Sequence, residues 1–196
     1  MLSADSRLNH SDHGHEALAV EVAGFAREWI TRAFHEQQTY VGAVLDNNAT
    51  LNALCTPIAL NPKLRDRERD YRFTVVEPSQ ITLLEEDDDG LFINVKRPGV
   101  TLWICESLQC LPAQPDYPIN LSYVDTCLAG CLTHFATAQQ GRAAATTFIQ
   151  TTAGWQHVVD DRINPQYPRR AEVSSAQQRV ISELLAQADI EISYAK

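Results

Sequence analysis

Two cysteines and a histidine stand at helical spacing in the segment INLSYVDTCLAGCLTHFATAQQ. Cys127, Cys131 and His134 occupy positions i, i+4 and i+7, so a helix would place all three on one face. Such a set of thiolates and an imidazole can bind zinc if another segment supplies a fourth ligand. Cysteine also behaves as a small hydrophobic residue in cores, and apolar residues flank these three. The pattern therefore indicates either a zinc site or the buried face of a helix.

The acidic run EEDDDG, residues 85–90, offers the oxygen donors and the glycine of half a calcium loop. The first, third, fifth and sixth positions of an EF-hand loop are matched. The twelfth position, however, is Lys96, where calcium needs a bidentate carboxylate, and the segment after the run has a strand pattern. The run is predicted to be a solvated turn, with the docking of a basic partner as an alternative role.

The N-terminal stretch HSDHGH could hold a transition metal weakly through His10, Asp12, His13 and His15. Ordering this polar, non-periodic segment around an ion would cost conformational entropy. Residues 1–14 are therefore predicted to be a flexible leader without a bound cofactor.

Nucleophilic catalysis by a cysteine needs a base and a group that orients the base. The chain supplies these residue types at scattered positions, namely Cys55, Cys105 and Cys110 as nucleophiles, His134 and His157 as bases, and Asp160 and Asp161 as orienting groups. It contains no Gly-x-Ser-x-Gly, Gly-x-Gly-x-x-Gly, P-loop or His-Glu-x-x-His motif. The sequence therefore favours a non-catalytic protein over an enzyme.

Arginines alternate with acids in LRDRERDY, residues 64–71. If this segment is extended, Arg65, Arg67 and Arg69 share one side and could face a partner. The alternative is a surface loop whose charges neutralise one another.

The bulk composition bounds the class of protein. The chain has 196 residues, 44% hydrophobic and 21% charged, which suits one globular domain. A net charge of −9 does not favour a nucleic-acid partner. Neither an apolar stretch of membrane-spanning length nor a signal peptide is present, so no membrane association and a cytoplasmic location are expected. Five cysteines without an export signal are expected to stay reduced.

Apolar residues near the N-terminus suggest a helix over residues 15–38. Leu18, Val22, Phe25 and Trp29 follow one another by four, three and four residues. With Phe34 they form an aromatic stripe wider than one core needs. We therefore expect Phe25, Trp29 and Phe34 to contact a second copy or another protein.

The middle of the chain predicts an antiparallel meander. It has a hairpin turn at 46–48, a charged loop at 56–70 and a type II turn at 97–99. The expected strands cover residues 71–76, 81–84, 91–95 and 100–108.

The last third of the chain predicts helices. One is expected over residues 119–140, ended by Gly141, and a final one over 175–189 behind a capping box that begins at Ser174 or Ser175. Residues 142–163 fit either a helix or a hairpin that turns at 152–154.

These elements define an α+β fold in a single domain, residues 15–196, with the meander packed against N-terminal, central and C-terminal helices. The predicted function is non-catalytic protein binding, as an adaptor, dedicated chaperone, immunity protein or assembly factor that acts as a homodimer. The alternative is a cysteine- and histidine-dependent enzyme or a zinc protein that uses Cys127, Cys131 and His134.

Overall fold

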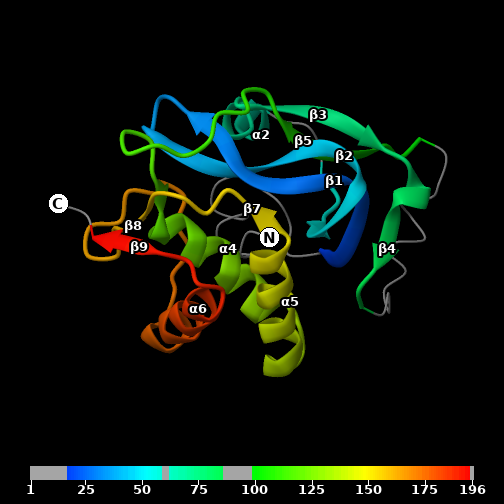
Figure 1. Cartoon of the computed structure of the whole chain (residues 1–196). Coiled ribbons are helices and arrows are strands. Elements are labelled where there is room, and N and C mark those ends of the chain that lie inside the picture. Colours follow the sequence, from blue (N-terminus) through cyan, green and yellow to red (C-terminus); the bar gives the residue numbers. More distant parts are fainter. Residues whose placement is uncertain (1–16, 59–61, 86–98, 195–196) are drawn as a thin grey trace.

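A long, twisted hairpin made of β1 (Leu18–Ala33) and β2 (Gln38–Cys55) is the central element of the fold. The structure is a computed structural model that describes residues 17–58, 62–85 and 99–194. In it, a curved sheet lies across three helices, so the α+β class is confirmed (Figure 1). The predicted leader lies outside the described residues.

The predicted helix over residues 15–38 is wrong, because this segment forms β1 and the turn after it. Leu18, Val20 and Val22 repeat every two residues, which is the strand period. Gly24, at a φ of +87°, sits where the pairing with β2 shifts register. This irregularity and a second one between Trp29 and Thr31 disturb the alternation, so the apolar positions also match a helical spacing.

The predicted turn at residues 46–48 is also wrong, since the hairpin reverses at residues 34–37. Asp46, Asn47 and Asn48 lie within β2, where the pairing jumps from Thr50 to Leu45. The N–H of Asn48 donates to the Asp46 carboxylate at 2.9 Å. This local side-chain bond supports a bulge in the strand instead of a chain reversal.

The other strands of the first sheet agree with the sequence pattern where they are described. They are β3 (Tyr71–Val76), β4 (Ile81–Leu83) and β5 (Leu102–Ser107), with a 3₁₀ turn η1 (Pro78–Gln80) before β4. The strand order is β3-β5-β2-β1-β4, and β7 (Thr152–Ala153) adds to β1. The meander is confirmed only in part, because β5 crosses to β2. The strand predicted at 91–95 and most of the turn at 97–99 lie outside the described residues.

Three helices cover one side of the sheet: α4 (Leu121–His134), α5 (Ala138–Gln150) and α6 (Ser175–Gln187). The single helix predicted over 119–140 is wrong, because the chain breaks after His134 and α5 continues past Gly141. The ambiguous stretch is helical to Gln150 and extended in β7. The final helix is confirmed, with Ser174 and Gln177 forming its capping box.

A small parallel sheet stands beside the helices. Its strands, in the order β6-β8-β9, are β6 (Ile119–Asn120), β8 (Val158–Asp160) and β9 (Ile192–Tyr194). Across the molecule, a further short helix, α2 (Pro62–Arg67), precedes β3.

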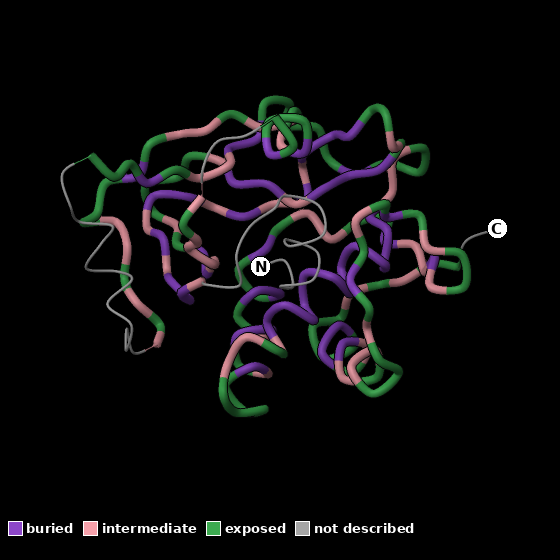
Figure 2. Tube along the Cα trace, turned by 180° about the vertical axis from the view of Figure 1, so that it is seen from behind, coloured by how far each residue is buried: buried purple, intermediate pink, exposed green. Residues whose placement is uncertain are grey.

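The hairpin contributes to two cores (Figure 2). Its open end supplies Leu18, Val20 and Phe25 to a cluster covered by β3, β4 and β5. Its turn end supplies Trp29 and Tyr40 to a larger cluster built mainly on the helices. The sheet therefore buries side chains on both sides of its twisted hairpin.

Substituting Gly141 with alanine should destabilise the protein. A Cβ at this position would lie 2.6 Å from the carbonyl oxygen of Leu132, where α5 crosses the end of α4. Gly→Ala inside a helix normally stabilises by up to about 1 kcal/mol, but this overlap should cost about 1–3 kcal/mol. Urea unfolding measures the sign, and an unchanged or higher free energy of unfolding would contradict the close crossing.

Candidate functional site

The outer face of the β3–β5 hairpin presents large apolar side chains to solvent. Val75 pairs with Trp103 across the two strands, and Phe73 meets the Trp103 ring edge-on with centroids 6.0 Å apart. Val75 is 56% exposed and Trp103 39% exposed. We call Phe73, Val75 and Trp103 the apolar patch.

Strand alternation explains why the patch faces outward. Val76 and Leu102, which form the neighbouring cross-strand pair, point the other way and are buried in the core shared with the long hairpin. The sequence YRFTVV thus divides its apolar residues between the two faces of the sheet, and only Val76 of its last two valines is buried.

A buried carboxylate braces the inner face of the same hairpin. Glu106 accepts hydrogen bonds from Nε of Arg72 at 3.0 Å and from the hydroxyl of Thr74 at 2.6 Å, and Nη2 of Arg72 completes a bidentate pair. These bonds, chiefly those from Arg72, lower the pKa of the Glu106 carboxyl. The ion pair links β3 to β5 on the face opposite the patch.

Replacing Glu106 with glutamine should reduce stability at neutral pH. The difference in stability between wild type and E106Q should depend on pH. Because the folded-state pKa of Glu106 is lowered, its contribution is present above the unfolded-state pKa and is lost as the pH falls through the folded-state value. The gap in thermal midpoint between wild type and E106Q should therefore narrow below about pH 4. Glu183→Gln, in an exposed pair with Arg142, is the control. A gap that is constant with pH would contradict this role.

Two of the residues predicted to face a partner are interior. Phe25 and Trp29 are almost fully buried. Trp29 packs edge-on against Tyr123 and Trp155, with ring centroids 5.6 and 5.0 Å away. Only Phe34, at the hairpin turn, is half exposed, and its ring meets Tyr117. The expectation of one exposed aromatic stripe fails because the segment is a strand buried on both faces.

The arginine stripe does not form, because Arg65 and Arg67 lie on α2 instead of an extended segment. Arg65 is exposed, whereas Arg67 is buried and its Nε lies 3.0 Å from the carboxylate of Glu68. Arg69 binds Glu36 in the turn of the long hairpin. The segment ties α2 to its neighbours, and it presents no continuous basic surface.

The proposed metal ligands are not brought together. Cys127 and Cys131 are buried in the helical core, while His134 bonds through Nε2 to the Glu85 carboxylate at 2.8 Å. Within the described part of the chain, no three histidine, cysteine, aspartate or glutamate side chains form a group suited to a metal ion. The histidine-rich N-terminal stretch lies outside that part.

Four of the five cysteines lack the environment of a nucleophile. Burial raises the pKa of Cys55, Cys105, Cys127 and Cys131, so each thiol is held in its protonated form. Cys110 is exposed, its thiol makes a weak contact with the carbonyl of Ser107, and its backbone forms a bridge with Thr31.

Glu85 is the one residue of the acidic run that the structure describes. Its carboxylate accepts from His134 and from the backbone N–H of Ala19. It therefore fastens the end of β4 to β1 and to the C-terminus of α4. The rest of the predicted turn lies outside the described residues.

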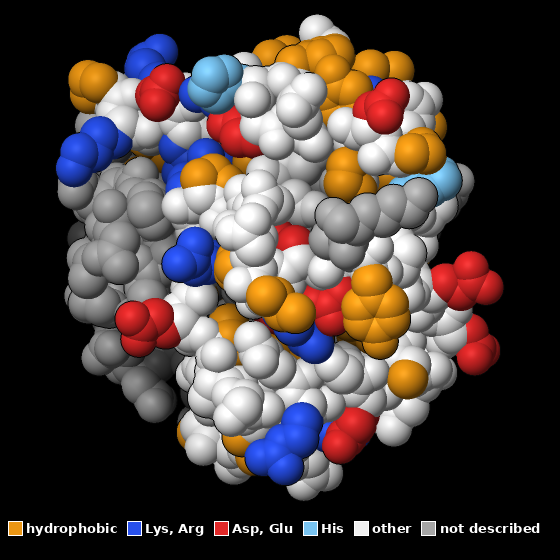
Figure 3. Space-filling model, turned by 90° about the vertical axis from the view of Figure 1, so that its left-hand side faces the viewer, with side chains coloured by type: hydrophobic (Ala, Val, Ile, Leu, Met, Phe, Trp, Pro, Cys, Tyr) orange, Lys and Arg blue, Asp and Glu red, His pale blue; other side chains and the backbone are white. Residues whose placement is uncertain are grey.

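Two hollows lie among the helices. The larger, of about 830 Å³, lies at the loop that precedes α6 and has Asp125 and Arg162 among its lining. Arg162 is already bound to Asp125 by two 2.7 Å hydrogen bonds and to Ser182 by one of 2.8 Å. The smaller, of about 390 Å³, lies between α5 and α6 beside Trp155. Acidic and basic side chains are interspersed on the face seen in Figure 3, without a continuous basic surface there.

Sequence reasoning missed a buried cation at the junction of sheet and helices. The guanidinium of Arg27 in β1 donates two hydrogen bonds to Asn52 in β2. One reaches the backbone carbonyl of Asn52 at 2.6 Å and the other its side-chain oxygen at 2.8 Å. It also donates to the hydroxyls of Thr151 and Thr152, at 2.6 and 2.8 Å, and to the Phe148 carbonyl at 3.2 Å. Burial lowers the pKa of Arg27 to about 10, which still leaves it charged at neutral pH.

Substitution of Arg27 by methionine should lower the free energy of unfolding by about 3 kcal/mol, because several buried acceptors lose their donors. Lysine keeps the charge but not the fork of donors, so R27K should be destabilised as well. Arg142→Met, at an exposed pair, should change stability by less than about 0.5 kcal/mol. Urea denaturation measures the free energy of unfolding of the three variants. An R27M protein as stable as the wild type would contradict the role of Arg27.

In comparisons with protein-family models, curated proteins and solved structures, the chain matches none. No helix among the described residues is long and apolar enough to cross a membrane.

Proposed function

We propose that this protein is a non-catalytic protein-binding protein of the cytoplasm, and that its docking surface is the apolar patch. The observation that carries the proposal is the cluster of exposed Val75 and Trp103 with half-buried Phe73 on the outer face of the β3–β5 hairpin. Contiguous apolar groups of this kind mark sites of association, and tryptophan is prominent among residues that dominate binding energy.

Two further properties suit a docking surface. The hairpin is braced from behind by Arg72 and Glu106, so the patch needs no rearrangement before binding. The edge-on contact between Phe73 and Trp103 also restricts both rings, which reduces the entropy lost when a partner covers them.

Trp103→Lys should abolish binding through the patch while the fold is kept. The matched control is Ile163→Lys, which also places lysine at an exposed apolar position but on a loop away from the hairpin. Wild type and I163K should form the same stoichiometric complex, with itself or with another protein, in native mass spectrometry of protein purified from its host. W103K, with an unchanged circular dichroism spectrum, should be monomeric. Identical complexes for all three proteins would overturn the patch as the docking surface.

A further inference from the structure

The larger hollow, beside α6, is lined by two pairs of opposite charges. Asp125 of α4 and Arg162 already bind each other through two 2.7 Å hydrogen bonds, so these charges are neutralised within the protein. Arg170 and Glu172, on the loop that precedes α6, also line the hollow and are exposed. Among the described residues, neither of these two side chains has a hydrogen-bond or ion-pair partner. One cation and one anion of the hollow are therefore available to a ligand.

The spacing of these two charges limits what can bind between them. Arg170 and Glu172 flank Ala171, which is buried and donates its N–H to the hydroxyl of Thr126 at 3.1 Å. Two residues of chain span at most about 7 Å, so the Cα atoms of Arg170 and Glu172 lie within that distance. A ligand group that contacts one of the two charges is therefore also close to the other.

Buried polar side chains of α4 hold this loop in place. Ser122 donates its hydroxyl to the Asp161 carboxylate at 2.6 Å and accepts from the N–H of Tyr167 at 3.1 Å. The backbone N–H of Ser122 binds the other oxygen of Asp161 at 2.7 Å. Because Ser122 and Thr126 are one helical turn apart, a single face of α4 fixes the loop at both Tyr167 and Ala171. The charged wall of the hollow is thus positioned before any ligand arrives, which reduces the entropy cost of binding.

The rest of the lining suits a small organic ligand. The volume of about 830 Å³ lies within the usual range for small-molecule sites, in which apolar walls surround a few polar groups. The apolar part of the lining comes from Pro165, Pro168, Ala171 and Val173. A ligand with charged ends and an apolar body would match both parts of this surface.

From these observations we propose that the hollow binds a dipeptide with free ends, whose carboxylate pairs with Arg170 and whose ammonium group pairs with Glu172. A simple anion at Arg170 would be repelled by the nearby Glu172, and a simple cation at Glu172 would be repelled by Arg170. A ligand that carries both charges avoids this repulsion. An extended dipeptide spans about 7 Å, which matches the largest separation of the two Cα atoms. The hollow lies at the helices, whereas β3 and β5 lie across the sheet (Figure 1), so this site does not depend on docking at the apolar patch.

Calorimetric titration with dipeptides that differ only at their ends tests the requirement for both charges. The probes are alanyl-alanine, valyl-valine and leucyl-leucine at pH 7, and at least one of them should bind in a saturable one-to-one manner. Acetylation of the amino end or amidation of the carboxyl end of that peptide should each raise the dissociation constant at least about tenfold. Each modification removes one charge-assisted contact, which accounts for a factor of this size.

Two variants assign each end of the peptide to its residue. Glu172→Gln should weaken binding of the free dipeptide at least about tenfold, but it should hardly change binding of the acetylated form, which has no ammonium group. Arg170→Gln should likewise weaken the free dipeptide and hardly change the amidated form. Both side chains are exposed and have no partner among the described residues, so the variants should fold normally, as circular dichroism would check.

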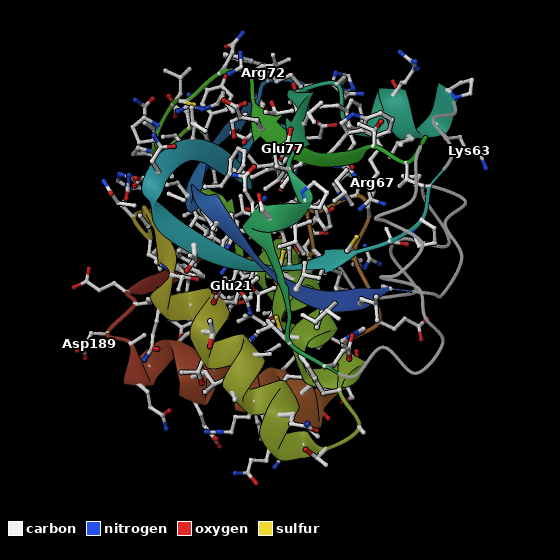
Figure 4. The ribbon with its side chains drawn as sticks, turned by 90° about the vertical axis from the view of Figure 1, so that its right-hand side faces the viewer. Glu21, Lys63, Arg67, Arg72, Glu77 and Asp189 are labelled. Atoms are coloured by element: carbon white, nitrogen blue, oxygen red, sulfur yellow. The ribbon has the colours of Figure 1, made fainter. Side chains whose placement is uncertain are left out.

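Matched controls remove the same charges elsewhere. Asp189→Asn removes a carboxylate just past the C-terminal end of α6, outside the lining of the hollow (Figure 4), and asparagine tolerates the φ of +54° at this position. Arg65→Gln removes an exposed guanidinium on α2. Both controls should bind the dipeptide as the wild type does. Trp103→Lys should also bind it normally, which keeps this test separate from the docking surface.

Each outcome of these titrations supports or overturns the site. Binding that is weakened by E172Q and R170Q in the expected pattern, and by neither control, supports it. Dipeptide binding that both variants leave unchanged overturns its placement in this hollow. Binding of inorganic phosphate or acetate without binding of a dipeptide overturns the requirement for two opposite charges. The absence of binding by all three dipeptides at millimolar concentrations overturns the site itself.

Discussion

The fold depends on a buried guanidinium without a carboxylate partner among the described residues. Arg27 lies in the middle of β1, and its hydrogen bonds reach β2, the last turn of α5 and β7. The acceptors are neutral, but the carbonyl end of α5 carries the negative end of the helix dipole. The cation also lies 3.9 Å from the centre of the Phe148 ring. These contacts together offset the desolvation of the charge, and they hold α5 in one position against the sheet.

The position of α5 determines which side chains are buried on each side of the sheet. With α5 fixed, Trp29 and Tyr40 are covered by helices, and the long hairpin must find its remaining partners on its other face and at its open end. β3, β4 and β5 supply them through Val76, Ile81 and Leu102. The β3–β5 hairpin buries the face that carries Val76 and Leu102, and on its other face it buries the end that carries Tyr71 and Ser107. The opposite end of that second face is left with Phe73, Val75 and Trp103.

The sequence predicts local structure well where a segment has one buried face or its own capping groups. YRFTVV alternates over a short strand, and Ser174 with Gln177 starts α6 by bonds that need nothing distant. The N-terminal segment misleads because β1 is buried on both faces and its bulges at Gly24 and after Trp29 shift the alternation. Asp46–Asn48 misleads because a strand bulge and a turn favour the same residue types.

The site could be predicted only in part, for a related reason. Cys127 and Cys131 share the helix face that was expected, but whether that face binds zinc or packs depends on what covers it, and here the covering elements are apolar. The role of Arg27 could not be predicted, because its partners at Asn52 and residues 148–152 are far away in sequence. The sequence could have predicted part of the patch, since Phe73 and Val75 alternate with Arg72 and Thr74. Its exposure depends on Trp103 lying opposite Val75, which follows from the tertiary pairing.

Edge strands usually protect themselves with charge, proline or a bulge. β3 has one charged residue, Arg72, whose side chain stays largely exposed while its guanidinium is paired with Glu106. The nearest proline, Pro78, comes after the strand, where it starts η1. A net charge of −9 repels two copies over long distances, yet at physiological ionic strength this repulsion is screened within about 8 Å. Contacts made by the apolar patch act at shorter range than that. Among the described strands, β3 ends the sheet, and the net charge does not prevent a partner from approaching its exposed side chains.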